Sequence, residues 1–236
     1  MVNIIFDVDD TLYDQMTPFK KALRENFEFV KTDEIAGIFK ASRSYSDQVF
    51  NQSEQGEITT ENMHIYRIKH ALQDYGYRIS DKEALDFQKV YTKKQNEITI
   101  FAGMKDILSL CQKSHVNLGI ITNGPKNHQW NKIYQLDLLQ WIKYERIIIS
   151  GEVGVAKPNP EIFFIMENKF SESDKTDFYY VGDNFTNDIV GAAQSGWNTV
   201  WFNHRRNLPT PTHTRIDASY TVSNTVELLA IINKII

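Results

Sequence analysis

Hydrophobic and polar positions follow two different patterns along the chain. The first apolar run, Val2–Asp7, is hydrophobic on both faces, as in a central strand of a parallel sheet that helices cover. From Thr17 to about Asn96, apolar positions instead recur at helical spacing, with no strand-like alternation between them. The predicted helices of this region are Phe19–Phe29, Asp33–Phe50, Thr60–Tyr75 and Asp81–Asn96.

Beyond residue 97, short apolar runs with strand character alternate with helical segments. The predicted strands are Val116–Thr122, Arg146–Ser150, Phe178–Gly182, Thr199–Phe202 and a short one near Tyr220. The predicted helices are Gly103–Lys113, Lys126–Leu136, Pro160–Asn168, Asp188–Gln194 and Thr225–Ile235, with a polar loop at His204–Arg215. In the second of these helices, Trp130 and Tyr134 are expected to face inward. This rhythm is typical of a doubly wound parallel sheet, so the fold class is α/β. We expect a core of residues 1–16 and 97–236 with an α-helical insertion at 17–96.

Composition narrows the class of protein. The 236 residues are 42% hydrophobic, which is enough for a sizeable core, and 26 basic against 30 acidic residues give a net charge of −4. There is no basic block, so a partner of polymeric nucleic acid is not expected, although individual nucleotides are compatible with the charge. Cys111 is the single cysteine and lies on an apolar helical face, so we expect it in the core.

The sequence also bears on location and partners. No apolar run approaches the roughly 20 residues that span a bilayer, and the first residues lack the basic and long apolar segments of a signal peptide. We therefore expect a cytoplasmic protein with no membrane partner, present as a monomer or a homodimer.

The first strand ends in a pair of carboxylates, Asp7 and Asp9. At i and i+2 of an extended chain they point the same way and lie roughly 6–7 Å apart. Carboxylates held about 4 Å apart repel by roughly 4 kcal/mol at an intermediate dielectric. Mg²⁺, a hard cation with oxygen ligands, would offset this repulsion. The alternative interpretation is that Asp7 to Asp10 are solvated loop acids or a helix N-cap.

Polar residues also follow the next strands of the sheet. Ligands of open α/β sheets bind beyond the carboxyl ends of the strands. Thr122-Asn123-Gly124 ends the second strand, where the Thr122 hydroxyl and the two following backbone N–H groups could hold phosphate oxygens. Taken alone, this tripeptide is an ordinary turn.

Three further charged residues complete the pattern. Lys157, in the loop after the third strand, offers a positive charge to a phosphate. Asp183 supplies another carboxylate for the cation, and Asp188 is expected as a supporting acid near Lys157. Taken singly, Lys157 is an ordinary surface lysine and Asp188 a helix N-terminal acid. Their succession at consecutive strand ends favours a phosphate site.

With these residues the chain resembles the haloacid dehalogenase-like hydrolase superfamily, in the subgroup whose helical cap lies between the first and second motifs. The matching motifs are Asp7–Leu12, Ile121–Gly124, Val155–Phe163 and Val181–Asp188. The family often has Ser after the last Gly-Asp, whereas this chain has Asn184.

The resemblance implies a mechanism. Asp7 would attack phosphorus to form an aspartyl-phosphate, and Asp9 would act first as general acid and then as base. Mg²⁺ would be held by Asp7, the Asp9 backbone carbonyl and Asp183. Thr122 and Lys157 would hold the phosphoryl group. Dehalogenases of the superfamily lack the acid two residues after the nucleophile, so Asp9 argues for phosphoryl chemistry.

Substrate choice is less constrained. The stretch Ala193–Asn203 is similar to the subfamily of pyrimidine 5′-nucleotidases. We expect a phosphomonoesterase acting on a small phosphate ester, with a nucleoside 5′-monophosphate preferred. A sugar-phosphate or phosphoglycolate phosphatase and a phosphosugar mutase are the alternatives within the family. Arg43, Tyr45, His64 and Arg67 are candidates to contact a leaving group and His128 to line the site, but helix-surface or core roles explain them equally.

Two alternatives lie outside enzymes of this kind. A phospho-receiver signalling domain also combines acids, Thr and Lys at strand ends and binds Mg²⁺. Asp9 and the insertion of about eighty residues count against it. A catalytically idle binding protein is disfavoured because no motif residue is missing.

Overall fold

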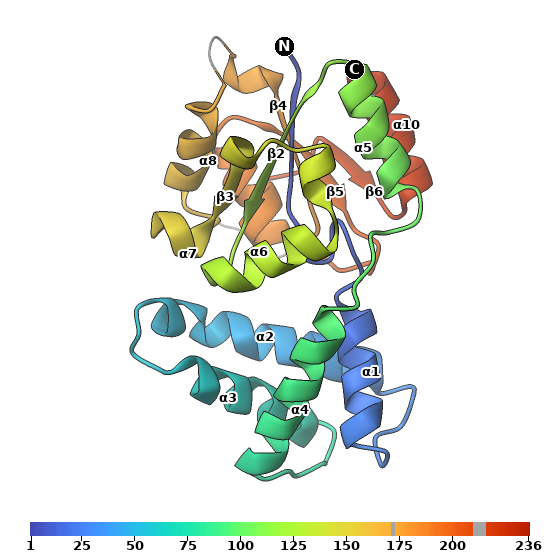
Figure 1. Cartoon of the computed structure of the whole chain (residues 1–236), viewed down its shortest axis with the longest axis vertical. Helices are drawn as coiled ribbons and strands as arrows, with labels where there is room; N and C mark the ends of the chain where they lie inside the picture. The colour runs from blue at the N-terminus through green and yellow to red at the C-terminus, as the bar shows by residue number, and fades with distance from the viewer. Residues whose placement is uncertain (171–172, 210–215) are drawn as a thin grey trace. The chain divides into compact units, whose positions relative to one another are not determined.

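The computed structural model describes residues 1–170, 173–209 and 216–236 (Figure 1). The chain divides into two compact units. One combines Met1–Asp14 with Thr99–Ile236 and is called the core unit here, and the other, Gln15–Ile98, is called the helical unit.

The core unit is built on a parallel sheet of six strands in the order β3-β2-β1-β4-β5-β6 (Figure 1). The strands are β1 (Asn3–Phe6), β2 (Asn117–Thr122), β3 (Ile147–Ile149), β4 (Phe178–Gly182), β5 (Asn198–Phe202) and β6 (Tyr220–Val222). All four residues of β1 are buried, as expected for a strand with neighbours on both sides and helices on both faces. The prediction of a doubly wound α/β fold is confirmed.

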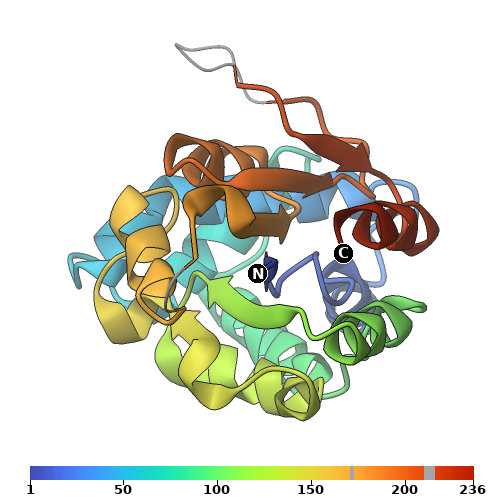
Figure 2. The same cartoon turned by 90° about the horizontal axis from the view of Figure 1, so that it is seen from above.

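Helices cover the sheet on both faces. They are α5 (Met104–Lys113), α6 (Lys126–Gln135), α7 (Ser150–Val153), α8 (Pro160–Glu167), α9 (Gly191–Gln194) and α10 (Thr225–Ile235). Helix α5 packs beside α10, and α8 beside α9 (Figure 2). Because parallel crossovers are right-handed, the reversal of strand order at β1 puts α5 and α6 on one face and α8 and α9 on the other.

An apolar layer under α8 fixes the strands that carry the polar residues. Ile5 of β1, Ile121 of β2 and Tyr180 of β4 pack in one cluster with Phe163 of α8 and with Trp197. The rings of Phe163 and Trp197 meet edge to face with centroids 5.3 Å apart. The ends of β1, β2 and β4 are therefore held from one side by large, close-packed side chains.

The helical unit has a core of its own. It contains α1 (Met16–Asn26), α2 (Ile35–Glu54), α3 (Thr60–Gln73) and α4 (Asp81–Gln95). Phe19 packs edge to face against Phe39 and Phe87, with centroids 5.3 and 5.4 Å apart. Helices α3 and α4 begin at side-chain caps, Thr59 and Ser80.

Several local predictions need correction. Tyr134 does not face inward but is 58% exposed, whereas Trp130 is buried and donates a hydrogen bond to Glu152. Strand β3 is shorter than predicted because a 3₁₀ turn precedes it and α7 starts at Ser150. The helix after β4 begins earlier, with a π-helical turn at Phe185–Val190. Residues 210–215 of the predicted loop lie outside the described part of the chain.

Candidate active site

Strand register brings the motif residues together at one edge of the sheet. Phe6 of β1 pairs with Ile120 of β2 and Val181 of β4, so the three strands end within two residues of one another. The Asp7 backbone N–H continues the ladder and donates to the Val181 carbonyl, 2.9 Å away. Residues just beyond these ends, including Asp7 and Asp183, are therefore neighbours.

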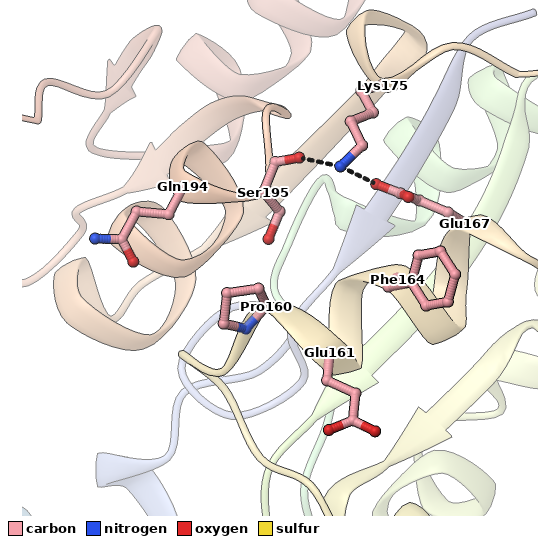
Figure 3. A pocket seen from close by; sticks show the side chains of 7 residues that line it. All are labelled: Pro160, Glu161, Phe164, Glu167, Lys175, Gln194 and Ser195. Atoms are coloured by element: carbon pink, nitrogen blue, oxygen red, sulfur yellow. Dashed lines mark hydrogen bonds and ion pairs between the residues drawn. The ribbon is translucent and has the colours of Figure 1, made fainter.

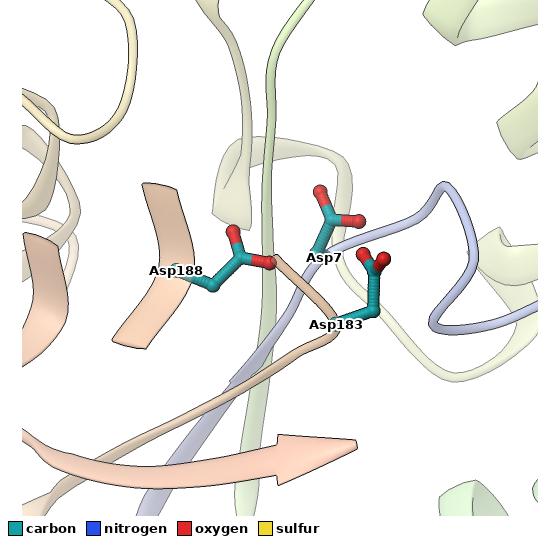
Figure 4. A group of neighbouring side chains, drawn as sticks. All are labelled: Asp7, Asp183 and Asp188. Atoms are coloured by element: carbon teal, nitrogen blue, oxygen red, sulfur yellow. The ribbon is translucent and has the colours of Figure 1, made fainter. Parts of the chain in front are cut away.

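Three carboxylates converge at this edge: Asp7, Asp183 and Asp188 (Figure 4). Each offers one oxygen, and these oxygens all lie within 4.8 Å of one another. Asp7 and Asp188 are buried, and Asp183 is half-buried. Carboxylate oxygens in such a group are the ligands that hard divalent cations prefer. The sequence placed Asp188 in a supporting position, and the structure puts it inside the group.

Lys157 neutralises part of this charge. Its buried ammonium group contacts Asp188 Oδ1 at 2.6 Å, Asp7 Oδ1 at 2.8 Å and the Tyr180 hydroxyl at 2.7 Å. These contacts use all three ammonium hydrogens. Burial opposes the charged form, but Asp188 and Asp7 outweigh it and raise the pKa of Lys157 well above its ordinary value.

Tyr180 is a member of the site that was not predicted from the sequence. Its hydroxyl donates to the Ile121 carbonyl at 2.7 Å while accepting from Lys157. The available signal was a tyrosine two residues before the Gly182-Asp183 end of β4.

Burial makes the carboxylates costly to ionise. It raises the pKa of Asp7 to about 7, with Lys157 opposing and Asp188 and Asp9 adding to the rise. Burial also raises the pKa of Asp183 well above its ordinary value, helped by the charges of Asp10, Asp188 and Asp7. With all three acids ionised, the group would carry more negative charge than Lys157 balances, so a bound cation would favour the ionised forms.

A tight packing contact fixes Asp188. A Cβ atom built on Gly182 would lie 2.4 Å from Asp188 Oδ2, so only glycine fits there. The same Oδ2 accepts the backbone N–H of Asn184 at 2.9 Å, and the Asn184 side chain accepts the N–H of Asn187. Asn184, the departure from the family pattern, therefore organises the turn that carries Asp183 and Asp188.

The Thr122-Asn123-Gly124 turn differs in part from its predicted use. The Thr122 hydroxyl is buried at the end of β2 and makes no hydrogen bond to the described residues. The Asn123 side chain grips the Lys157 backbone, donating to its carbonyl and accepting its N–H at 2.9 Å each. The Gly124 N–H, expected to bind phosphate, instead donates to Ser150 Oγ at 2.8 Å.

The Asp9 carboxylate has a different set of partners. Lys132 Nζ lies 2.7 and 2.6 Å from its two carboxylate oxygens, Gln129 Nε2 donates at 3.0 Å, and the Tyr13 hydroxyl donates to Oδ1. Burial alone would raise the pKa of Asp9, but Lys132 and these hydrogen bonds hold it well below its ordinary value. The Asp9 carboxylate is thus outside the group formed by Asp7, Asp183 and Asp188.

Neither Lys132 nor Gln129 was predicted from the sequence. Their signal was a lysine and a glutamine three residues apart on a predicted amphipathic helix, both of which turn out to be buried. Asp10 is also outside the carboxylate group, because Arg205 donates to both of its oxygens at 2.6 Å.

Two of the other candidates, Tyr45 and Arg67, hydrogen-bond within the helical unit. In the helical unit, Tyr45 donates to the Asp74 carboxylate and Arg67 donates to Gln88 at 2.7 Å. Burial, followed by the nearby Arg67 charge, lowers the pKa of His64 to about 3. Arg43 lies on α2, and His128 is a half-buried residue of α6.

A hollow of about 330 Å³ lies elsewhere on the core unit, beside α8 (Figure 3). None of the predicted site residues lines it. Its lysine, Lys175, is held by the Ser195 carbonyl at 3.0 Å and lies 3.6 Å from Glu167. No helix among the described residues is both long and apolar enough to cross a membrane.

The fold and this edge define a doubly wound α/β protein whose site combines carboxylates with a buried lysine. Residues 4–202 match the family model of haloacid dehalogenase-like hydrolases. The chain belongs to this family, and its predicted membership is confirmed.

Relatives span nearly the whole chain. The HAD-hydrolase YfnB of Bacillus subtilis is 26% identical over 232 residues, covering 98% of this chain and 94% of its own. The pyrimidine 5′-nucleotidase YjjG of Escherichia coli is 27% identical over 229 residues, covering 95% of each. The glyceraldehyde 3-phosphate phosphatase of Pyrococcus abyssi is 28% identical over 201 residues, covering 85% of this chain and 81% of its own.

Solved structures agree on the fold. A crystal structure of YfnB bound to magnesium aligns with a TM-score of 0.73 at 24% identity, covering 98% of both chains. The L-2-haloacid dehalogenase of Xanthobacter autotrophicus aligns with a TM-score of 0.72 at 13% identity, covering 99% of both.

Proposed function

We propose that the protein is a Mg²⁺-dependent phosphomonoesterase that acts through an aspartyl-phosphate on Asp7. The observation that carries this proposal is the lysine ammonium bridging Asp7 and Asp188 beside Asp183. Acids at this edge suit a cation, and Lys157 with the cation suits the doubly charged phosphate of a monoester.

The donor set fits magnesium. Asp7 and Asp183 supply carboxylate oxygens, and the resemblance adds the Asp9 backbone carbonyl. Asp188 keeps a supporting role, because its two oxygens are used by Lys157 and the Asn184 N–H. A bound Mg²⁺ would neutralise charge on the phosphoryl oxygens and fix their orientation.

The residues of the chain divide the chemistry into two steps. A carboxylate oxygen of Asp7 attacks phosphorus, and the bond to the leaving oxygen breaks as that oxygen takes up the proton of the Asp9 carboxyl group. Water then attacks the phosphorus of the aspartyl-phosphate, Asp9 accepts a proton of that water, and the bond to Asp7 breaks to release phosphate. When a phosphate binds, Lys157 would exchange one of its present acceptors for a phosphoryl oxygen, and the Thr122 hydroxyl would hold another.

The protonation state of Asp9 matters for both steps. Its ion pair with Lys132 favours the carboxylate, which is the form that accepts a proton from water. To protonate a leaving alkoxide, Asp9 must first bind a proton. A halide needs none, so an acid held in place by three side chains supports phosphoryl transfer over dehalogenation. Release of chloride from 2-chloropropionate would contradict this.

We propose a nucleoside 5′-monophosphate as the preferred small-molecule substrate. The similarity to a pyrimidine 5′-nucleotidase supports this choice, and the similarity to a glyceraldehyde 3-phosphate phosphatase makes a sugar phosphate the alternative. Phosphate release from a panel of pyrimidine and purine monophosphates, sugar phosphates and phosphoglycolate would rank them. A requirement for a bisphosphate would indicate a mutase.

The nucleophile assignment is tested by Asp7→Asn. With 4-nitrophenyl phosphate and Mg²⁺, we expect hydrolysis to fall by roughly a thousandfold or more, because the amide cannot form the acyl phosphate. A chelator should stop the unmodified protein. Asp106→Asn is the control, since Asp106 is exposed on α5. Undiminished turnover by the Asp7 variant would refute the proposal.

A further inference from the structure

We infer that Lys132 is a positioning residue for the breakdown of the aspartyl-phosphate, because it holds the Asp9 carboxylate in one orientation. The inference rests on the proposed function and assigns a role to α6, which lies outside the four sequence motifs.

The contacts of Asp9 define this orientation. Lys132 Nζ reaches both oxygens, at 2.7 and 2.6 Å, so it restrains rotation of the carboxylate as well as its position. Gln129 Nε2 lies 3.0 Å from Asp9 Oδ2 and 2.7 Å from the Asn123 carbonyl. The amide of Gln129 therefore ties the Asp9 carboxylate to the turn after β2.

Burial separates Lys132 from an ordinary surface lysine. Its side chain is 4% exposed, against 56% for Lys126 on the same helix, which pairs with Glu152. Burying a lysine costs side-chain entropy and desolvation, which a specific pairing must offset. Gln129 and Lys132 lie three residues apart and thus on one helical face, so a single helix places both groups on Asp9.

The same helix couples Asp9 to the phosphate end of the site. Helix α6 starts four residues after Thr122, and the Asn123 side chain grips Lys157. Asp9, Thr122 and Lys157 are therefore positioned by one continuous segment. A carboxylate freed from Lys132 could turn away from the water that it must deprotonate.

The consequence differs between the two steps. With 4-nitrophenyl phosphate, the leaving phenolate departs without a proton from Asp9, so formation of the aspartyl-phosphate does not need the restraint. Breakdown does, because Asp9 accepts a proton from the attacking water. Misplacing a general base costs roughly 10- to 100-fold in rate.

Rapid-quench kinetics of Lys132→Met with 4-nitrophenyl phosphate and Mg²⁺ test this. We expect a burst of nitrophenol close to one equivalent, followed by turnover about 10- to 100-fold slower than in the unmodified protein. Intact-mass measurement of quenched samples should show the phosphorylated protein accumulating. Lys132→Arg, which keeps the cation, should lie between the two, and Lys126→Met should behave as the unmodified protein.

Other results would contradict either the role of Lys132 or the proposed function. Burst and turnover falling together, or neither changing, would contradict the role of Lys132 in breakdown. If Lys132→Met does not fold, Lys132→Gln, which removes the charge but keeps a polar side chain, takes the same readout, and unchanged breakdown in it would contradict the inference. An unmodified protein that forms no phosphoenzyme would overturn the proposed function itself.

Discussion

At the residue scale, the site depends on buried charged groups that specific hydrogen bonds and ion pairs hold in place. Lys157 has three acceptors for its three hydrogens, and Asn123 fixes the backbone that carries it. Leaving a buried charged group without one partner costs more than the hydrogen bond is worth, because its desolvation is then uncompensated. Small changes around Lys157 should therefore have large effects.

Asn123→Ala tests this arrangement. The change removes both side-chain hydrogen bonds to the Lys157 backbone, so we expect a loss of about 1–2 kcal/mol in the free energy of unfolding. We also expect roughly tenfold lower kcat, since the ammonium is less well placed. Urea unfolding and initial rates provide the measurements. Asn127→Ala, at an exposed position of α6, is the control, and an unchanged kcat would contradict the assigned role of Asn123.

Site residues that follow the end of a strand could be predicted from the sequence. Site residues that lie within a helix or strand could not. Asp7, Thr122 and Asp183 follow apolar runs, and parallel strands must end at a common edge. Lys132 and Tyr180 lie inside elements, where the same spacing also fits a core position. The hydrogen-bond partner of such a side chain depends on how elements distant in the chain pack together.

At the element scale, the helical unit shows where local signals are sufficient. Helix α4 starts with a capping box in which Ser80 Oγ accepts the Glu83 N–H and the Glu83 carboxylate accepts the Ser80 N–H. This local pattern needs no tertiary partner, which is why the helix start at Asp81 could be predicted from the sequence.

Ser80→Ala should destabilise the helical unit by about 1 kcal/mol, the usual loss for a removed N-cap. The backbone and side-chain hydrogen bonds of Ser80 lower the pKa of Glu83 in the folded protein. That contribution is present above the ordinary Glu pKa and is lost as pH falls through the lowered value. Alanine keeps the backbone N–H and removes only the share of the Ser80 hydroxyl, so the stability difference between variant and unmodified protein should shrink modestly in acid. Urea unfolding at pH 7 and pH 3 measures it, and a difference independent of pH would contradict the role of Glu83.

Tertiary packing explains the features that were predicted wrongly from the sequence. The π-helical turn at Phe185–Val190 lets Asp188 reach Lys157 while Phe185 packs on Trp201. Tyr134 faces outward and stacks on Trp130, which takes the inward position instead. A helical period alone cannot rank two aromatic residues four positions apart on one face.

At the scale of the whole molecule, the crowded acids connect the proposed function to stability. Burial and neighbouring charges raise the pKa of Asp183, so the folded protein binds a proton there more readily than the unfolded chain. This contribution to stability is complete below the ordinary carboxyl pKa and is lost as pH rises through the raised value. Near neutral pH the metal-free protein should therefore carry a cost that Mg²⁺ removes.

Asp183→Asn separates these effects. Without metal at pH 7.5, we expect the variant to have a higher Tm than the unmodified protein, since the amide removes one of the mutually repelling charges. Mg²⁺ at about 100 times its Kd should stabilise the unmodified protein by about 2.7 kcal/mol and the variant far less, because a ligand of the cation is lost. Thermal unfolding with Mg²⁺ or chelator measures both, with Asp106→Asn as control. Equal magnesium stabilisation of the Asp183 variant and the unmodified protein would place the cation elsewhere, and a lower metal-free Tm would show that Asp183 is not repelled by its neighbours.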